Sequence, residues 1–215
     1  MKKKRILAMI LAVASCLSLA VGASAAGTTT RKATDFKDFD KSAWYAEAVS
    51  AAVDNGLLYG KSATIIDPNG DMTRAEMAAI INRSFGCYKT ADISQYKDVS
   101  KSKWYYKDVA LAVQMGTYNG RSSSAMAPDS PITRQEAMTV VARALGLDYD
   151  SYSKTDLSAF SDRSEISNWA LPYVRAMVGA DYIHGRGKVL APLDNIRARN
   201  LRRFFTTSSA LISQL

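Results

Sequence analysis

The chain has 215 residues, of which 47% are hydrophobic and 22% are charged, so its composition is that of a folded protein rather than a disordered one. The formal net charge of +8 comes from the two ends, because residues 27–196 contain 20 basic and 20 acidic residues. A nucleic-acid-binding domain needs a basic face of its own. The neutral body therefore argues against a nucleic-acid partner.

The N-terminus has the three-part layout of a secretory signal. Four basic residues precede an apolar run that continues to Val21, and the small residues 23–25 follow. We expect residues 1–25 to be a cleaved signal peptide and residues 26–35 a linker. Two alternatives remain: the apolar run could be kept as a membrane anchor, or Cys16 could belong to a lipoprotein-type signal. After cleavage we expect a secreted chain without stable membrane insertion.

An internal repeat with a period of 60 residues fills most of the remaining chain. A third, looser copy begins at Phe160 and keeps the aromatic, aspartate, tryptophan, glycine and proline landmarks. The aligned pairs of the first two copies are Phe36 and Tyr96, Asp38 and Asp98, Trp44 and Trp104, Gly56 and Gly116, Gly60 and Gly120, Pro68 and Pro128, Thr73 and Thr133, Arg74 and Arg134, Glu76 and Glu136, and Arg83 and Arg143. We place repeats at 36–86 and 96–147 and a partial repeat at 160–196, with linkers at 87–95 and 148–159 and a divergent basic tail at 197–215.

Each full copy predicts two helices. Apolar residues recur at i, i+4, i+7 and i+8 after each tryptophan, and Gly56 and Gly116 follow where a helix would end in a left-handed turn. The second helix opens with the sequence Thr-Arg-x-Glu at Thr73 and again at Thr133, which fits a capping box. No alternating pattern requires a strand. The sequence therefore predicts an all-α fold of tandem helix-loop-helix repeats.

The order Phe/Tyr-x-Asp, Trp, Gly-x-x-x-Gly, Pro and Thr-Arg-x-Glu closely resembles the S-layer homology domain. The resemblance implies a pseudo-threefold bundle of three repeats with grooves between neighbours. In that family the grooves bind secondary cell-wall polysaccharide, often with pyruvylated sugars, and hold proteins on the bacterial wall without catalysing a reaction. The alternatives are a remnant of a larger wall-active hydrolase and a structural S-layer or envelope tether subunit.

The candidate ligand-binding residues are Arg74, Arg134, Trp44, Trp104, Asp38, Asp98, Gly60 and Gly120. An arginine in a first helical turn opposes the helix dipole, so each arginine is expected to grip a ligand carboxylate or to form an interhelical salt bridge. Each tryptophan either stacks on a sugar or plugs the core. Each aspartate either caps a turn or contacts the ligand, and each glycine permits either an awkward turn or close approach of a sugar.

The third copy departs from the pattern after Ile196, where residues 197–200 replace the Thr-Arg-x-Glu sequence. One inserted nucleotide after codon 196 could turn residues 197–206 into Thr-Arg-Glu-Lys-Phe-Ala-Pro-Ile-Leu-Tyr, so we hypothesise a frameshift and the possible loss of one groove. His184 is the only histidine, and Cys87 is the only cysteine after cleavage. We therefore expect no catalytic site, cofactor, disulfide or metal site.

Overall fold

The computed structural model describes residues 31–200. The predicted signal peptide and most of the basic tail lie outside these residues. The helices are α2 (Ala46–Asp54), α3 (Arg74–Phe85), α4 (Tyr106–Gln114), α5 (Arg134–Ala144) and α6 (Leu171–Gly179), with short 3-10 helices η1 (Ala33–Asp35), η2 (Tyr149–Tyr152), η3 (Arg163–Glu165) and η4 (Ala198–Asn200). Between residues 31 and 200 the extended backbone forms only isolated bridges. The all-α prediction is confirmed.

The capping boxes and the left-handed glycine predicted from the sequence are present at the helix ends. The Thr73 hydroxyl accepts from the Glu76 backbone N–H at 3.2 Å, and the Glu76 carboxylate accepts from the Thr73 N–H at 2.9 Å. Thr133 and Glu136 repeat this capping box at the start of α5. After α2, Gly56 adopts a left-handed φ of 67°. The helix starts are therefore fixed by side chains three residues apart.

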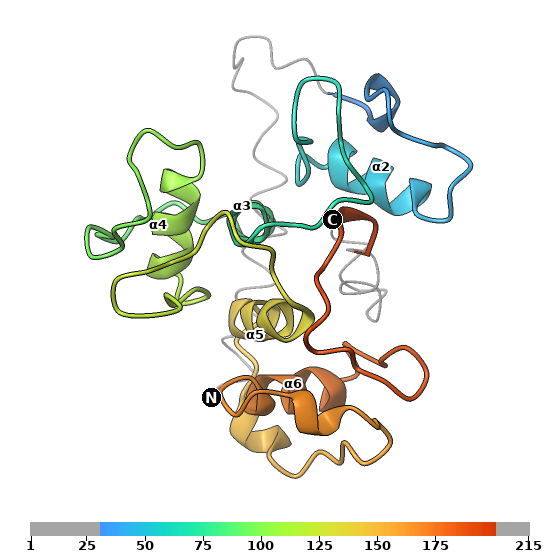
Figure 1. Cartoon of the computed structure of the whole chain (residues 1–215), viewed down its shortest axis with the longest axis vertical. Coiled ribbons are helices and arrows are strands. Elements are labelled where there is room, and N and C mark those ends of the chain that lie inside the picture. The colour runs from blue at the N-terminus through green and yellow to red at the C-terminus, as the bar shows by residue number, and fades with distance from the viewer. Residues whose placement is uncertain (1–30, 201–215) are drawn as a thin grey trace.

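The helices pack across repeats rather than only within them (Figure 1). The second helix of one repeat packs on the first helix of the next, so α3 contacts α4 and α5 contacts α6. The short η4, which stands where the third repeat would begin its second helix, contacts α2. The three repeats thus form a closed circle.

A ring of backbone hydrogen bonds joins the three repeats at the centre of this circle. The Met72 N–H donates to the Ile196 carbonyl at 2.7 Å, and the Ile196 N–H donates to the Ile132 carbonyl at 3.0 Å. The Ile132 N–H closes the ring on the Met72 carbonyl at 2.9 Å. All three side chains are buried. The predicted pseudo-threefold arrangement is present, and it includes the third repeat as far as Arg199.

The apolar core extends over all three repeats, with one separate part. Buried residues from α3, α4, α5 and α6 form a continuous cluster. The first half of repeat 1 has its own small cluster, built on Phe36, Tyr45, Val49, Val53 and Ile66. At the junctions between repeats, α4 packs on α3 and α6 packs on α5, whereas α2 packs on the short η4.

Candidate functional site

The tryptophans that open the three repeats all lie on the surface. Trp44, Trp104 and Trp169 are 54%, 59% and 51% exposed. The residues that plug the core are their neighbours Tyr45 and Tyr105, whose rings meet the tryptophans edge to face at centroid distances of 5.7 and 5.4 Å. Of the two interpretations given to these tryptophans, the core plug is therefore wrong.

A cavity of about 390 Å³ lies between repeat 1 and the start of repeat 2, beside the end of repeat 3. Repeat 1 supplies most of its wall, Trp104 comes from repeat 2, and Ala198 comes from the end of repeat 3. We call it the Ala198 cavity. Its lining includes Tyr59, Lys61, Glu76, Arg83, Trp104 and Ala198.

Arg74 is buried at the junction of repeats 1 and 2, where its side-chain donors have protein partners. Its Nε donates to the Met126 carbonyl at 3.0 Å, and its Nη1 lies 2.9 Å from the Glu136 carboxylate. Its guanidinium also lies 5.2 Å from the centroid of the Tyr118 ring, and the Tyr118 hydroxyl donates to the Arg74 carbonyl. The structure thus places Arg74 in a salt bridge between helices, the second of the two interpretations.

Arg134 occupies the same place at the junction of repeats 2 and 3. It is 4% exposed, and its Nε donates to the Leu190 carbonyl at 2.8 Å. Position 200, which corresponds to Glu136 in the next repeat, is an asparagine. The buried arginine and its carbonyl partner therefore recur at the second junction without the same carboxylate.

The aspartates that begin each repeat hold the loop before the second helix. The Asp38 carboxylate accepts from the backbone N–H groups of Ile66 and Asp67 at 2.9 and 2.7 Å. Asp98 and Asp162 make the same pair of hydrogen bonds in the second and third repeats. In each loop the second amide belongs to a non-glycine residue with a φ between 50° and 54°. These carboxylates stabilise a strained turn, in agreement with the turn interpretation.

Gly60 and Gly120 are required for packing within their own repeats. A Cβ at Gly60 would lie 2.5 Å from the Phe36 ring and 2.7 Å from the Ile65 carbonyl. A Cβ at Gly120 would lie 2.4 Å from the Tyr96 ring. Close packing inside each repeat therefore explains both glycines, and Gly60 also adopts a left-handed φ of 80°.

Sequence reasoning missed the cations that accompany the exposed aromatics. The Lys61 ammonium pairs with Glu76 at 2.7 Å, and Arg121 pairs with Glu136 at 3.0 Å in the next repeat. The Arg83 guanidinium lies 4.1 Å from the centroid of the Tyr59 ring and donates to the Leu57 carbonyl. The 60-residue repeat aligns Arg83 with Arg143. This pairing was a sequence signal that could have identified Arg83.

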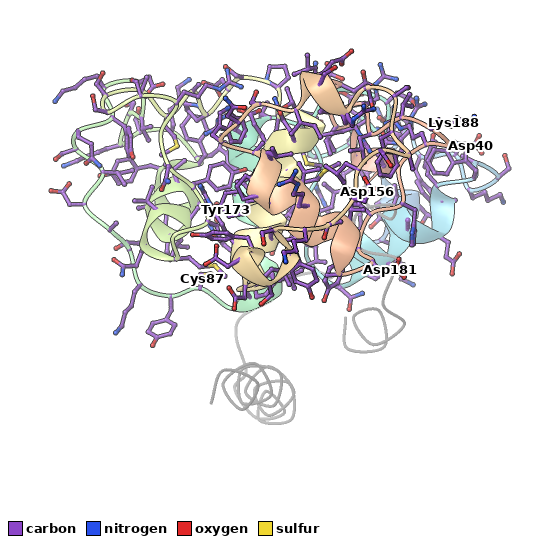
Figure 2. All side chains as sticks on the ribbon, turned by 90° about the horizontal axis from the view of Figure 1, so that it is seen from below. Asp40, Cys87, Asp156, Tyr173, Asp181 and Lys188 are labelled. Carbon is purple, nitrogen blue, oxygen red and sulfur yellow. The ribbon has the colours of Figure 1, made fainter. Side chains whose placement is uncertain are left out.

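The remaining candidates from the sequence lie apart from this cavity. His184 is exposed and lies 3.4 Å from Asp181, and both belong to repeat 3. Cys87, labelled in Figure 2, is half-buried against Met115, and burial raises the pKa of its thiol. In the part of the chain that the structure describes, no group of three metal-ligating side chains comes together.

Comparison with known proteins agrees with this architecture. The family model of the S-layer homology domain matches residues 35–78, 95–138 and 159–197, which follow the three repeats. The chain belongs to the S-layer homology domain family. The match to the third repeat ends at residue 197, where the Thr-Arg-x-Glu sequence is lost.

Curated relatives of this S-layer homology chain include surface proteins and glycosidases. It is 33% identical over 154 residues to a surface-layer 125 kDa protein of Lysinibacillus sphaericus, covering 71% of the chain and 13% of that protein. It is 29% identical over 201 residues to the middle cell wall protein of Brevibacillus brevis, covering 89% of the chain and 18% of that protein. It is 26% identical over 190 residues to an endoglucanase of a Bacillus strain, covering 85% of the chain and 19% of that protein. The chain thus spans less than a fifth of each of these relatives.

The family places the chain at the bacterial cell surface or wall, as a binding module. Over residues 31–200, the helices are all too short or too polar to cross a bilayer.

Proposed function

We propose that this chain anchors itself, and any protein joined to it, to the bacterial cell wall by binding a secondary cell-wall polysaccharide in the spaces between its repeats. The sugar is acidic and carries a carboxylate, of which a pyruvylated sugar is one example. The chain acts by binding alone, without a cofactor. Whole proteins named as surface-layer proteins and as glycosidases share this module, which favours anchoring over catalysis as its contribution.

The observation that carries this proposal is an exposed tryptophan beside basic side chains. Trp104 is 59% exposed and borders the Ala198 cavity together with Tyr59, Lys61 and Arg83. An exposed aromatic face offers a stacking surface for a sugar ring, and its exposure leaves apolar area to be buried on binding. Lysine and arginine beside it can donate charge-assisted hydrogen bonds to a carboxylate. Trp44 and Trp169 repeat the exposed aromatic in the other two repeats.

The test is co-sedimentation of the mature chain with purified bacterial wall before and after chemical removal of the secondary polysaccharide. We expect binding that disappears with the polymer and is weakened by Trp104→Ala. Since Trp104 is exposed, this variant should keep the circular dichroism spectrum and melting temperature of the parent chain.

Tyr88→Ala is the matched control, because Tyr88 is an aromatic residue that is 81% exposed and lies outside the cavity. It should bind the wall like the parent chain. Binding that survives removal of the polysaccharide, or that Trp104→Ala and Tyr88→Ala weaken equally, would contradict the proposal.

A further inference from the structure

A further cavity, of about 440 Å³, lies on the third repeat, between α6 and the linker that precedes this repeat. We call it the linker cavity. Three basic residues from three segments line it: Lys154 from the linker, Arg163 from η3 and Arg175 from α6. The linker cavity and the Ala198 cavity have no lining residue in common, so they are separate sites.

The basic side chains of the linker cavity are only partly satisfied by the protein. Between residues 31 and 200, none of the three forms an ion pair. Arg175 donates from Nη1 to the Ser153 carbonyl at 3.1 Å, but its buried Nε has no acceptor within the described chain. A buried donor without an acceptor is unusual in a folded protein, because its lost hydration is not replaced. A ligand oxygen beside this guanidinium would complete its hydrogen bonding.

Asp156, labelled in Figure 2, is the acidic residue in the wall of the linker cavity, and the local turn accounts for it. Its carboxylate accepts from the Ser158 backbone N–H at 2.8 Å and from the Ser158 hydroxyl at 2.6 Å. Asp92 accepts from the Ser94 N–H in the same way in the linker before repeat 2. Three cations against this one carboxylate leave the cavity wall with a net charge of +2.

The two arginines of the linker cavity are peculiar to the third repeat. Counted from the aspartate and the tryptophan that open each repeat, they correspond to Val99 and Ala110 in repeat 2, which are both buried in the apolar core. Repeat 1 has Phe39 and Ser50 at the same positions. The repeat therefore folds without arginine at either position, so packing alone does not explain this pair.

We propose that the linker cavity binds a phosphate group. Its cations come from three segments, so they can contact different oxygens of a tetrahedral anion, whereas one bidentate arginine already satisfies a planar carboxylate. A net charge of +2 matches a phosphate monoester, which carries about −1.5 to −2 at pH 7. Ser153 and Thr155 also line the cavity, and their hydroxyls can donate to further oxygens. This site is independent of whether the Ala198 cavity binds a sugar.

The phosphate could belong to a monoester or to a phosphodiester that links the units of a wall polymer. Glycerol 3-phosphate represents the first source and glycerophosphoglycerol the second. Because the diester carries a single negative charge, we expect the monoester to bind more tightly. Tighter binding of the diester would support the polymer as the source, and both results support a phosphate site.

The experiment titrates the full chain with each phosphate compound, with acetate and with glycerol by calorimetry, and follows the phosphate compounds by phosphorus NMR. Ionic strength is kept constant, because salt screens exposed charges. Acetate is the carboxylate control, and glycerol is the neutral one. We expect saturable binding of the phosphate compounds at one site, weaker binding of acetate and no saturable binding of glycerol.

Variants with the residues of repeat 2 test the position of the site. Arg163→Val and Arg175→Ala should each weaken phosphate binding about tenfold, and the double variant should abolish it. Lys107→Ala is the matched control, because Lys107 is an exposed cation on α4 outside the cavity. It should bind phosphate like the parent chain. So should Trp104→Ala, which separates this site from the proposed function.

Circular dichroism and the melting temperature establish that each variant is folded. Absence of saturable phosphate binding, equal binding of acetate or glycerol, or undiminished binding in the folded double variant would overturn the proposal. If the double variant does not fold, Arg163→Val decides instead, because Arg163 is exposed and lies outside α6. A loss in Arg163→Val no greater than in Lys107→Ala then contradicts the assignment.

Discussion

Replacing Arg74 with alanine should destabilise the whole chain, because the arginine joins two repeats in a buried position. The change removes the hydrogen bond from Nε to the Met126 carbonyl and the ion pair with Glu136, whose side chains are 6% and 11% exposed. Removing one partner of a buried ion pair costs about 3–5 kcal/mol. Glu136 keeps Arg121 as a partner, so the lower end applies, about 3 kcal/mol.

For a chain of this length, about 3 kcal/mol corresponds to a fall in melting temperature of about 6–12 °C. Differential scanning calorimetry of the parent and the Arg74→Ala chain measures it. Lys61→Ala is the control, because the Lys61–Glu76 pair is a third to a fifth exposed and should contribute about 0–1 kcal/mol.

A double-mutant cycle of Arg74→Ala with Glu136→Gln isolates the pair, since glutamine can keep the helix cap. The reasoning is refuted if Arg74→Ala lowers the melting temperature no more than Lys61→Ala, or if the two changes in the cycle are additive.

Three further changes test the turns and the core. Asp98→Asn should lower the unfolding free energy by about 1.5–3 kcal/mol in urea titrations, because it weakens two charge-assisted hydrogen bonds to the following loop; an unchanged urea midpoint would contradict this. Gly120→Ala should destabilise by about 3 kcal/mol, because its Cβ would lie 2.4 Å from both the Tyr96 ring and the Ser122 carbonyl, whereas Gly116→Ala, with nothing within 4 Å, should cost about 1–2 kcal/mol from its positive φ alone; equal losses in the same titration would argue against the collision. Burial raises the pKa of Tyr105 to about 12 from about 10 when unfolded, so its contribution to the unfolding free energy is complete below pH 10 and is lost between pH 10 and 12, and a Tyr105→Phe chain measured across that range should lack this part of the decline.

Features that depend on neighbours three or four residues apart could be predicted from the sequence. The capping boxes at Thr73 and Thr133 and the left-handed turn at Gly56 satisfy local backbone groups, so the pattern alone identifies them. The pseudo-threefold arrangement came from the family resemblance rather than from this local chemistry.

Features that depend on distant partners could not be predicted in the same way. Arg74 and Glu136 are 62 residues apart and meet only because α3 of one repeat faces the next repeat. Trp104 and Tyr105 are adjacent large aromatics, and sequence alone does not say which one faces the core. Ala198 occupies the position of Arg74 and Arg134, as the backbone shows: the Arg199 N–H donates to Pro68 just as the Ala75 and Gln135 N–H groups donate to Pro128 and Pro192. The restored reading frame would place arginine at this position, so sequencing the gene past codon 196 remains the test of the frameshift hypothesis.

The central ring of Met72, Ile132 and Ile196 governs the order in which the molecule can assemble. Met72 and Ile196 are separated by more than half of the chain, so their hydrogen bond cannot form until the third repeat has been made. Long-range pairings of this kind slow folding, because the loop must close before the contact stabilises it. A linear solenoid can begin to fold at any repeat. Loss of an end unit lowers the stability of the remaining repeats only a little. In this circular arrangement residues 196–199 of the third repeat complete the packing of the first repeat, so removal of these residues should weaken the first repeat.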